Sequence, residues 1–183
     1  MPHLALMTIG RLLAPWGDPI LRGFEERIDE TFATAAKSPG FVALIGGEER
    51  GDGEVEQGAR DGGPQVVPPA FADPEVQDRI ATTLSVWRDA ESAFAFSYRG
   101  IHGAALRERH AWFAKVDAPS HVAWWIDEGH MPTWAEAAAR HAELASTGPS
   151  ARAFDFRSPF GADGRATTID REAVRGHAPS PTA

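Results

Sequence analysis

Three absences narrow the class of protein that this sequence can encode. None of its 183 residues is cysteine, which excludes disulfide bonds, thiolate nucleophiles and zinc sites with thiolate ligands. No apolar run approaches the roughly 18 residues of a membrane span, and no basic segment followed by an apolar one marks a signal peptide. We therefore expect a soluble, cytoplasmic protein without a membrane partner.

Basic residues are scarce as well. Lysine occurs twice, the formal net charge is −8 and the pI is near 5.3, so no basic surface for nucleic acid is expected. Apolar residues make up 43% of the chain, which suffices for one core at this length. We expect one domain over residues 1–160, with a polar tail over 161–183 that has little to bury.

Four short segments have the composition and alternation typical of β-strands. Each is apolar or β-branched and is bounded by Pro, Gly or polar residues. The predicted strands are 3–13, 41–45, 81–87 and 121–127.

Three longer segments predict helices. Asp18-Pro19 is a capping residue followed by proline, and apolar residues then recur every four positions to about residue 36. The segment 91–113 has helical periodicity. Thr133 and Glu136 have the spacing of a capping box that opens a helix to about residue 145.

The order β-α-β-β-α-β with an added C-terminal helix is that of a ferredoxin-like α+β fold. Residues 46–73, rich in Gly, Pro and acidic side chains, predict a long mobile loop within it. Two helices on one face of the sheet would leave the other face bare, so we expect that face to pack against a second copy in a homodimer. The side chains expected there are Leu4, Leu6, Val42, Leu44, Leu84, Val86, Val122, Trp124 and Ile126.

The central segment 91–113 carries the most informative side chains. At 100° per residue, His102 and Arg109 fall on the same stripe as Tyr98 and several apolar residues. Gly100 and Gly103 flank His102, and they either thin the helix there or break it.

Several motifs in combination resemble one family. They are a Trp ending the third strand, Tyr-x-x-x-His and Arg-x-x-Trp-Phe on the central helix, Trp-Trp-x-x-x-Gly-His-x-Pro, and Gly-Pro-Ser before Ala-Phe. Over about residues 4–156, apart from most of the loop, the chain is similar to the uncharacterised DUF3291 family. The resemblance implies a dimeric α/β barrel of the antibiotic-monooxygenase-like superfamily, which includes cofactor-free monooxygenases, haem proteins, isomerases and lyases.

Three residues of the central helix are the catalytic candidates. His102 titrates near neutrality and is the natural general base, or the axial ligand if haem is bound. Arg109 would hold an anion, and Tyr98 would orient His102 or donate a proton. Equally, His102 would be a satisfied core residue, and Arg109 would pair with a carboxylate such as Glu91 or Asp127.

Aromatic and polar residues nearby are the candidates for substrate binding. Trp87, Trp112 and Trp125, with Ser85 of the third strand, would wall a cavity between helix and sheet; the alternative is that the tryptophans only pack the core. His130 lies in a loop and would contact substrate or cap the next helix. No HExxH or two-histidine, one-carboxylate spacing indicates a metal site.

These observations favour a small-molecule tailoring enzyme. The expected reaction is an oxygenase-like oxidation of an aromatic or polyketide-like metabolite, either without a cofactor or with haem. The alternatives are a non-catalytic small-molecule binding domain, and a lyase, isomerase or cyclase that uses the same groups without oxygen.

Overall fold

The structure, a computed structural model, describes residues 1–46 and 60–177. Its centre is a single open sheet in the order β3-β2-β4-β1-β5, which makes this a mixed α+β protein. The strands are β1 (His3–Arg11), β2 (Phe41–Gly46), β3 (Arg60–Asp61), β4 (Ile80–Trp87) and β5 (His121–Ile126). All of them except β3 agree with the predicted strands to within two residues, and these four pair antiparallel.

The short strand β3 falls in the segment 46–73, which was predicted to be a loop. It runs parallel to β2, with Arg60 opposite Ile45. The carbonyl of Gly62, just after it, accepts a hydrogen bond from the Trp134 backbone N–H at 3.1 Å. Residues 47–59 of the predicted loop lie outside the described residues.

The predicted helix starts are confirmed. Two of the predicted helices, however, are divided into shorter elements. Ile20 donates its N–H to the Asp18 carboxylate at 3.0 Å, and Glu136 donates its N–H to the Thr133 hydroxyl at 3.1 Å. The elements are η1 (Pro19–Leu21), α1 (Arg22–Glu25), α2 (Ile28–Lys37), η2 (Gln77–Arg79), α3 (Ala90–Tyr98), α4 (Gly100–Glu108), η3 (Arg109–Ala111), α5 (Trp134–Thr147) and α6 (Arg171–Gly176).

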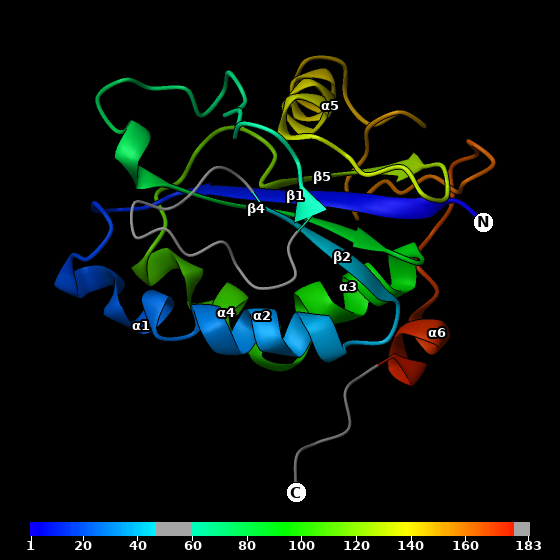
Figure 1. Ribbon diagram of the computed structural model, residues 1–183, viewed down its shortest axis with the longest axis horizontal. Helices are drawn as coiled ribbons and strands as arrows, with labels where there is room; N and C mark the ends of the chain where they lie inside the picture. The colour runs from blue at the N-terminus through cyan, green and yellow to red at the C-terminus, as the bar shows by residue number, and fades with distance from the viewer. Residues whose placement is uncertain (47–59, 178–183) are drawn as a thin grey trace, which may run out of the picture.

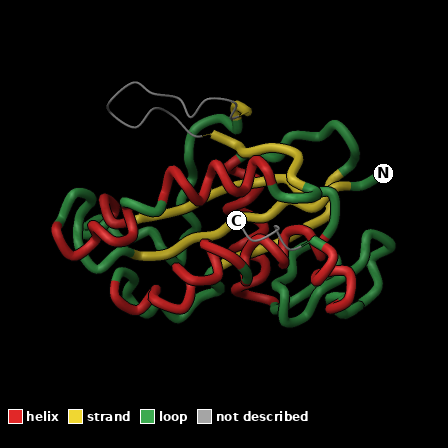
Figure 2. Tube along the Cα trace, turned by 90° about the horizontal axis from the view of Figure 1, so that it is seen from below, coloured by secondary structure: helices red, strands yellow, loops and turns green. Residues whose placement is uncertain are grey.

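Helices lie on both faces of the sheet. Figure 1 shows α5 on one face and α1, α2, α3, α4 and α6 on the other, and Figure 2 views this larger helix layer in front of the strands. Trp134 and Leu144 of α5 join the core on their face, and the Trp134 indole donates a hydrogen bond to the Gly46 carbonyl at 2.8 Å. The expectation of a bare sheet face is therefore wrong, and the homodimer that it suggested stays a prediction.

The expected interface set also mixes two faces. Leu84, Val86, Val122, Trp124 and Ile126 do share a face, the one that α5 covers. The inclusion of Leu4 and Leu6 is wrong, because these residues pack in the core of the helix layer.

The register of β1 explains this error. Leu4 pairs with Trp87, whereas Ala5 pairs with Val86, and directly paired residues point to the same face. A shift of one residue moves every side chain of a strand to the other face. Leu44, which pairs with Ser85, likewise points away from α5.

The segment after residue 160 corrects another expectation. It contains α6, whose Val174 is fully buried, and Ile169 just before it is 9% exposed. Asp170 caps α6 and donates its own N–H to the Glu91 carboxylate at 3.1 Å. The tail through residue 177 therefore packs on the helix layer, because these apolar residues find partners on α3.

Replacing Val174 with Ala should lower the free energy of unfolding by roughly 1–3 kcal/mol, because the lost methyl groups leave a cavity between α6 and α3. Chemical denaturation monitored by circular dichroism measures the change. Arg175→Ala, at the exposed next position, is the matched control and should have little effect. Equal stabilities of the Val174 variant and the parent chain would show that α6 does not contribute to the fold.

Candidate functional site

The central helix is broken between α3 and α4. Arg99 is extended, with φ −125° and ψ 174°, and Gly100 has φ +54°, a conformation that favours glycine. Gly103 lies against the end of α3, where an added Cβ would be 2.5 Å from the Tyr98 carbonyl oxygen. The two glycines suggested either a thinned helix or a broken one, and the helix is broken.

His102 is fixed in one tautomer by the break. Its Nδ1 lies 2.8 Å from the carbonyl oxygen of Ser97, and a carbonyl only accepts hydrogen bonds, so Nδ1 carries the proton. In the neutral ring Nε2 then has a free lone pair, and no described residue hydrogen-bonds to it. Burial lowers the pKa of His102, while the bond to Ser97 opposes that shift. His102 is therefore neutral at pH 7, and its Nε2 is a proton acceptor.

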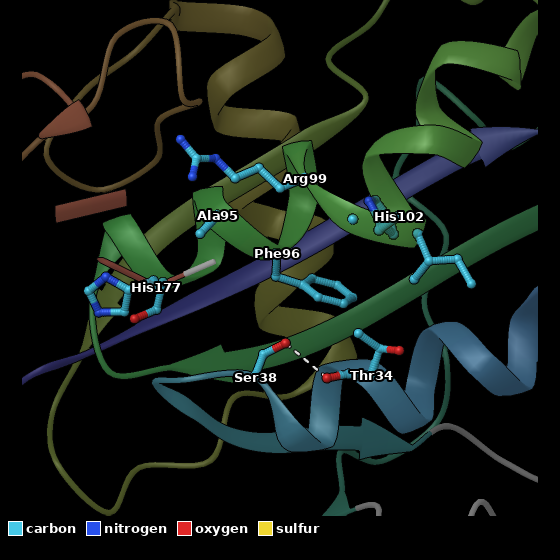
Figure 3. A pocket seen from close by; sticks show the side chains of 10 residues that line it. Thr34, Ser38, Ala95, Phe96, Arg99, His102 and His177 are labelled. Carbon is cyan, nitrogen blue, oxygen red and sulfur yellow. Dashed lines mark hydrogen bonds between the residues drawn. The ribbon is translucent and has the colours of Figure 1, made fainter. Parts of the chain in front are cut away.

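A small pocket opens beside His102 (Figure 3). Its volume is about 10 Å³, which is room for about one water molecule. His102 and His177 lie at opposite ends of the lining, and Figure 3 shows Phe96 projecting between them. The lining comes from the end of α2, from α3, from the first turn of α4 and from the residue after α6: Thr34, Ser38, Ser92, Ala95, Phe96, Arg99, Gly100, Ile101, His102 and His177.

The lining of the pocket is mainly apolar, and two features add polar groups to it. The Ser92 side chain is almost fully buried, and its hydroxyl has no hydrogen-bond partner within the described ranges. The first turn of α4 lacks a side-chain cap, so its backbone N–H groups and the positive end of the helix dipole are available to a ligand. A polar or negatively charged group suits these neighbours.

The break sends Tyr98 away from His102. The Tyr98 ring stacks on Phe94 at 4.5 Å and meets Phe156 edge-on at 6.1 Å. The His102 ring instead packs on Phe96 at 5.0 Å. Because Phe94 and Phe96 point to opposite sides of α3, Tyr98 and His102 are separated by the helix, and Tyr98 does not orient the imidazole.

Arg109 is not part of the pocket either. It is exposed in η3, where its guanidinium donates to the Leu106 carbonyl at 2.9 Å. Within the described ranges it pairs with neither Glu91 nor Asp127. Neither Tyr98 nor Trp112 lines the pocket beside His102.

The three candidate tryptophans have separate partners. The fully buried Trp87 donates its indole N–H to the Ser85 hydroxyl at 2.9 Å. The Arg27 guanidinium lies over the Trp112 ring, 5.2 Å from the centroid of that ring. The Trp125 indole donates to the Phe160 carbonyl at 2.7 Å. None of the three lines the pocket, and their contacts are those of packing residues.

His130 lies on the far side of the sheet, beside α5. Its Nε2 is 2.9 Å from one Glu136 carboxylate oxygen, and the other oxygen accepts the Trp124 indole N–H, also at 2.9 Å. Glu136 therefore links His130 to the sheet residue Trp124, and the residue that caps α5 is Thr133.

Sequence reasoning missed most of the pocket lining. On a continuous helix Arg99 points away from the stripe of His102, and only the break brings both residues to the same pocket. Ser92 and His177 reach it through tertiary contacts that no local pattern encodes. Ser38 was recognisable only as the end of the preceding helix.

The pocket does not fit a haem. Cofactor sites typically enclose about 300–1,000 Å³, and the space at His102 is far smaller. No step is therefore assigned to this group. The described ranges also contain no set of three His, Cys, Asp or Glu side chains arranged to hold a metal ion.

The fold and the site define a class: an α+β protein whose open sheet lies between helices on both faces, with a small pocket at a helix break. The chain belongs to the family described as "Domain of unknown function (DUF3291)", which matches residues 3–171. In the described ranges no helix is long and apolar enough to cross a membrane.

Other comparisons add little. No curated protein matches the chain. Among solved structures, PA3566 from Pseudomonas aeruginosa is 10% identical with a TM-score of 0.42, and the match covers 71% of this chain and 97% of that one.

Replacing Gly103 with Ala should destabilise the protein. In an ordinary helix interior this change stabilises by about 1 kcal/mol, but here the new methyl group collides with the Tyr98 carbonyl, and we expect a loss of roughly 1–3 kcal/mol. Denaturant unfolding measures it, and Ala at the exposed Gly176, where nothing lies within 4 Å of an added Cβ, is the control. A gain in stability at Gly103 would mean that the helix is continuous.

Stability should also fall in acid. Burial lowers the pKa values of His102, His121 and His141 in the folded state, so the unfolded chain takes up protons first, from about pH 6.5 downward. These three neutral histidines thus contribute fully to the stability of the fold above that pH, and their contribution is lost below it. His102→Gln should make the stability less dependent on pH between 7 and 5 in denaturation experiments, whereas His110→Gln, at an exposed position, should not. An unchanged slope for His102→Gln would contradict this.

Proposed function

We propose that this protein is a small-molecule tailoring enzyme in which Nε2 of His102 removes a proton from the substrate. The observation that carries the proposal is the 2.8 Å contact between His102 Nδ1 and the Ser97 carbonyl. It commits the ring proton to one nitrogen and leaves the other as a base beside the pocket. A general base must be unprotonated at the working pH, and a neutral imidazole meets that requirement.

Removal of a proton creates an anion, and the surroundings of His102 suit one. The uncapped N-terminus of α4 presents backbone N–H groups, which stabilise developing negative charge. Arg99 lines the same pocket, and its guanidinium, which Figure 3 shows directed away from His102, would add a positive charge if the side chain turned inward. In this proposal Arg99 and the helix end take the role that the sequence had suggested for Arg109.

The small volume limits how a substrate binds. A pocket of about 10 Å³ admits the reacting group of a substrate and leaves the rest of an aromatic molecule outside. The bulk of such a substrate would lie over the rim between α2 and the α3–α4 break. Deeper binding would require α6, which brings His177 to the lining, to move outward.

If the substrate anion then reacts with dioxygen, the reaction is oxygenase-like. The family resemblance supports such an oxidation of an aromatic or polyketide-like metabolite. The same proton removal without oxygen serves a lyase, isomerase or cyclase. A ligand held without proton transfer would make the protein a binding domain.

We also propose that the sheet is ferredoxin-like, a proposal supported by the neighbours β2-β4-β1-β5 and their antiparallel pairing. A homodimeric barrel is proposed on the family resemblance alone. It would need a second sheet to pack on the face that α5 occupies, so α5 would have to move before the barrel could close.

Deuterium exchange tests the proton-abstraction step separately from oxidation. Phenolic and 1,3-diketone aromatics are incubated with the protein in D₂O without oxygen, and mass spectrometry follows deuterium incorporation at carbon. The wild type should accelerate exchange, His102→Gln should slow it by about 100-fold or more, the usual contribution of a general base, and His110→Gln should match the wild type. Exchange that survives in His102→Gln would remove His102 as the base.

With the same compounds under air, an oxygen electrode separates the possible reactions. Oxygen uptake that depends on His102 supports the oxygenase. Exchange without uptake supports a lyase, isomerase or cyclase. Binding with neither exchange nor uptake supports a binding domain.

A further inference from the structure

The pocket beside His102 has a second end, which the proposed proton transfer does not use. His177 lies at that end, opposite His102 (Figure 3). Ser92 and Arg99 both line the pocket, and seven residues of helix rise about 10.5 Å. The lining is therefore longer than the reacting group of a substrate, and its far end is available to another part of the same molecule.

Ser92 lies at the His177 end of the lining. His177 directly follows α6, and α6 packs beside the first half of α3. The N-cap residue of α6 donates its N–H to the Glu91 carboxylate at 3.1 Å, and the Arg171 guanidinium lies 4.6 Å from the centroid of the Phe94 ring. Because Glu91 and Phe94 lie on either side of Ser92 in the helix, Ser92 and His177 share this end of the pocket.

The two side chains offer complementary hydrogen-bonding groups. His177 Nδ1 lies 2.7 Å from the Ala173 carbonyl oxygen, which only accepts, so Nδ1 carries the proton and Nε2 of the neutral ring is an acceptor. Ser92 is 1% exposed, and its hydroxyl has no hydrogen-bond partner among the residues that the structure describes. An unpaired buried hydroxyl is costly, so a ligand group that pairs with it gains binding energy.

We propose that Ser92 and His177 bind a hydroxyl group at the far end of an elongated aromatic substrate. The inference rests on the proposed function, in which His102 takes the proton at the near end. The Ser92 hydroxyl donates to the ligand oxygen, and the ligand O–H donates to His177 Nε2. The ring system between the two ends lies along Phe96, which projects between the two histidines (Figure 3), and aromatic contacts there are favourable.

A hydroxyl is the group that matches both neighbours. A carboxylate only accepts hydrogen bonds and would set its lone pairs against that of His177 Nε2. An ether would accept from Ser92 and leave His177 without a donor. An ammonium group would bring a positive charge to a lining that contains no carboxylate, and burying an unpaired charge is costly. The substrate class is therefore an aromatic molecule with a hydroxyl group at each end.

The far end must open to admit this group. The pocket volume is about 10 Å³, which is room for about one water molecule. The wall that can yield is α6, a helix of six residues that follows an exposed segment over 162–168. Elements with few buried contacts open at the lowest cost in free energy, so α6 moves outward when the substrate enters.

Calorimetric titration of the full chain with two matched ligands tests the proposal. 4,4′-Dihydroxybiphenyl has a hydroxyl at each end, and 4-hydroxybiphenyl lacks one of them. The wild type should bind the diol at least about tenfold more tightly, because two hydrogen bonds form and a buried hydroxyl gains a partner. Ser92→Ala should bind both ligands equally. Ser97→Ala is the matched control, since that buried hydroxyl on α3 already donates to the Ala93 carbonyl at 2.8 Å, and it should keep the preference for the diol.

Further variants make the outcome decisive. His177→Phe removes the acceptor and should also abolish the preference for the diol. No binding of the diol by the wild type, equal binding of the two ligands, or a preference that survives in Ser92→Ala or His177→Phe would overturn the site. Melting curves verify that each variant is folded.

Failure of the proposed function gives a different result. His102→Gln should lose the catalysed deuterium exchange and keep the preference for the diol, because Ser92 and His177 are unchanged. A wild type that prefers the diol without catalysing exchange would support this site and overturn only the role of His102 as the base.

Discussion

The hydrogen bond from His102 to the Ser97 carbonyl is the contact on which the helix layer depends. The last carbonyls of a helix have no intrahelical partner, and α3 ends at Tyr98, so the His102 side chain satisfies a group that the break would leave unpaired. The same bond selects the imidazole tautomer. The contact thus stabilises the break that Arg99 and Gly100 make between α3 and α4.

Much of the sheet could be predicted because strands carry a local signal. Alternation and turn residues located β1, β2, β4 and β5 nearly to their ends. Which face each side chain occupies could not be predicted, because that depends on register, and register is set by strands far apart in the sequence. Leu4 and Leu84 are both apolar strand residues, yet they lie in cores on opposite faces.

The candidate site was predictable only in part, for the same physical reason. His102 was found because a titratable side chain on an apolar stripe is unusual, and it does line a pocket. Its expected neighbours Tyr98 and Arg109 do not line that pocket, because a helical projection assumes one continuous axis. The positive φ of Gly100 redirects the chain after it, which a projection onto one helix cannot show.

The pairing of β1 with β4 has a consequence for how the chain is made. Leu4 finds its partner only when Trp87 is available, and the other neighbour of β1, β5, is synthesised later still. During translation the apolar first strand therefore leaves the ribosome long before either partner and must stay unpaired meanwhile. Contacts so distant in sequence slow folding, and an exposed strand is prone to aggregation.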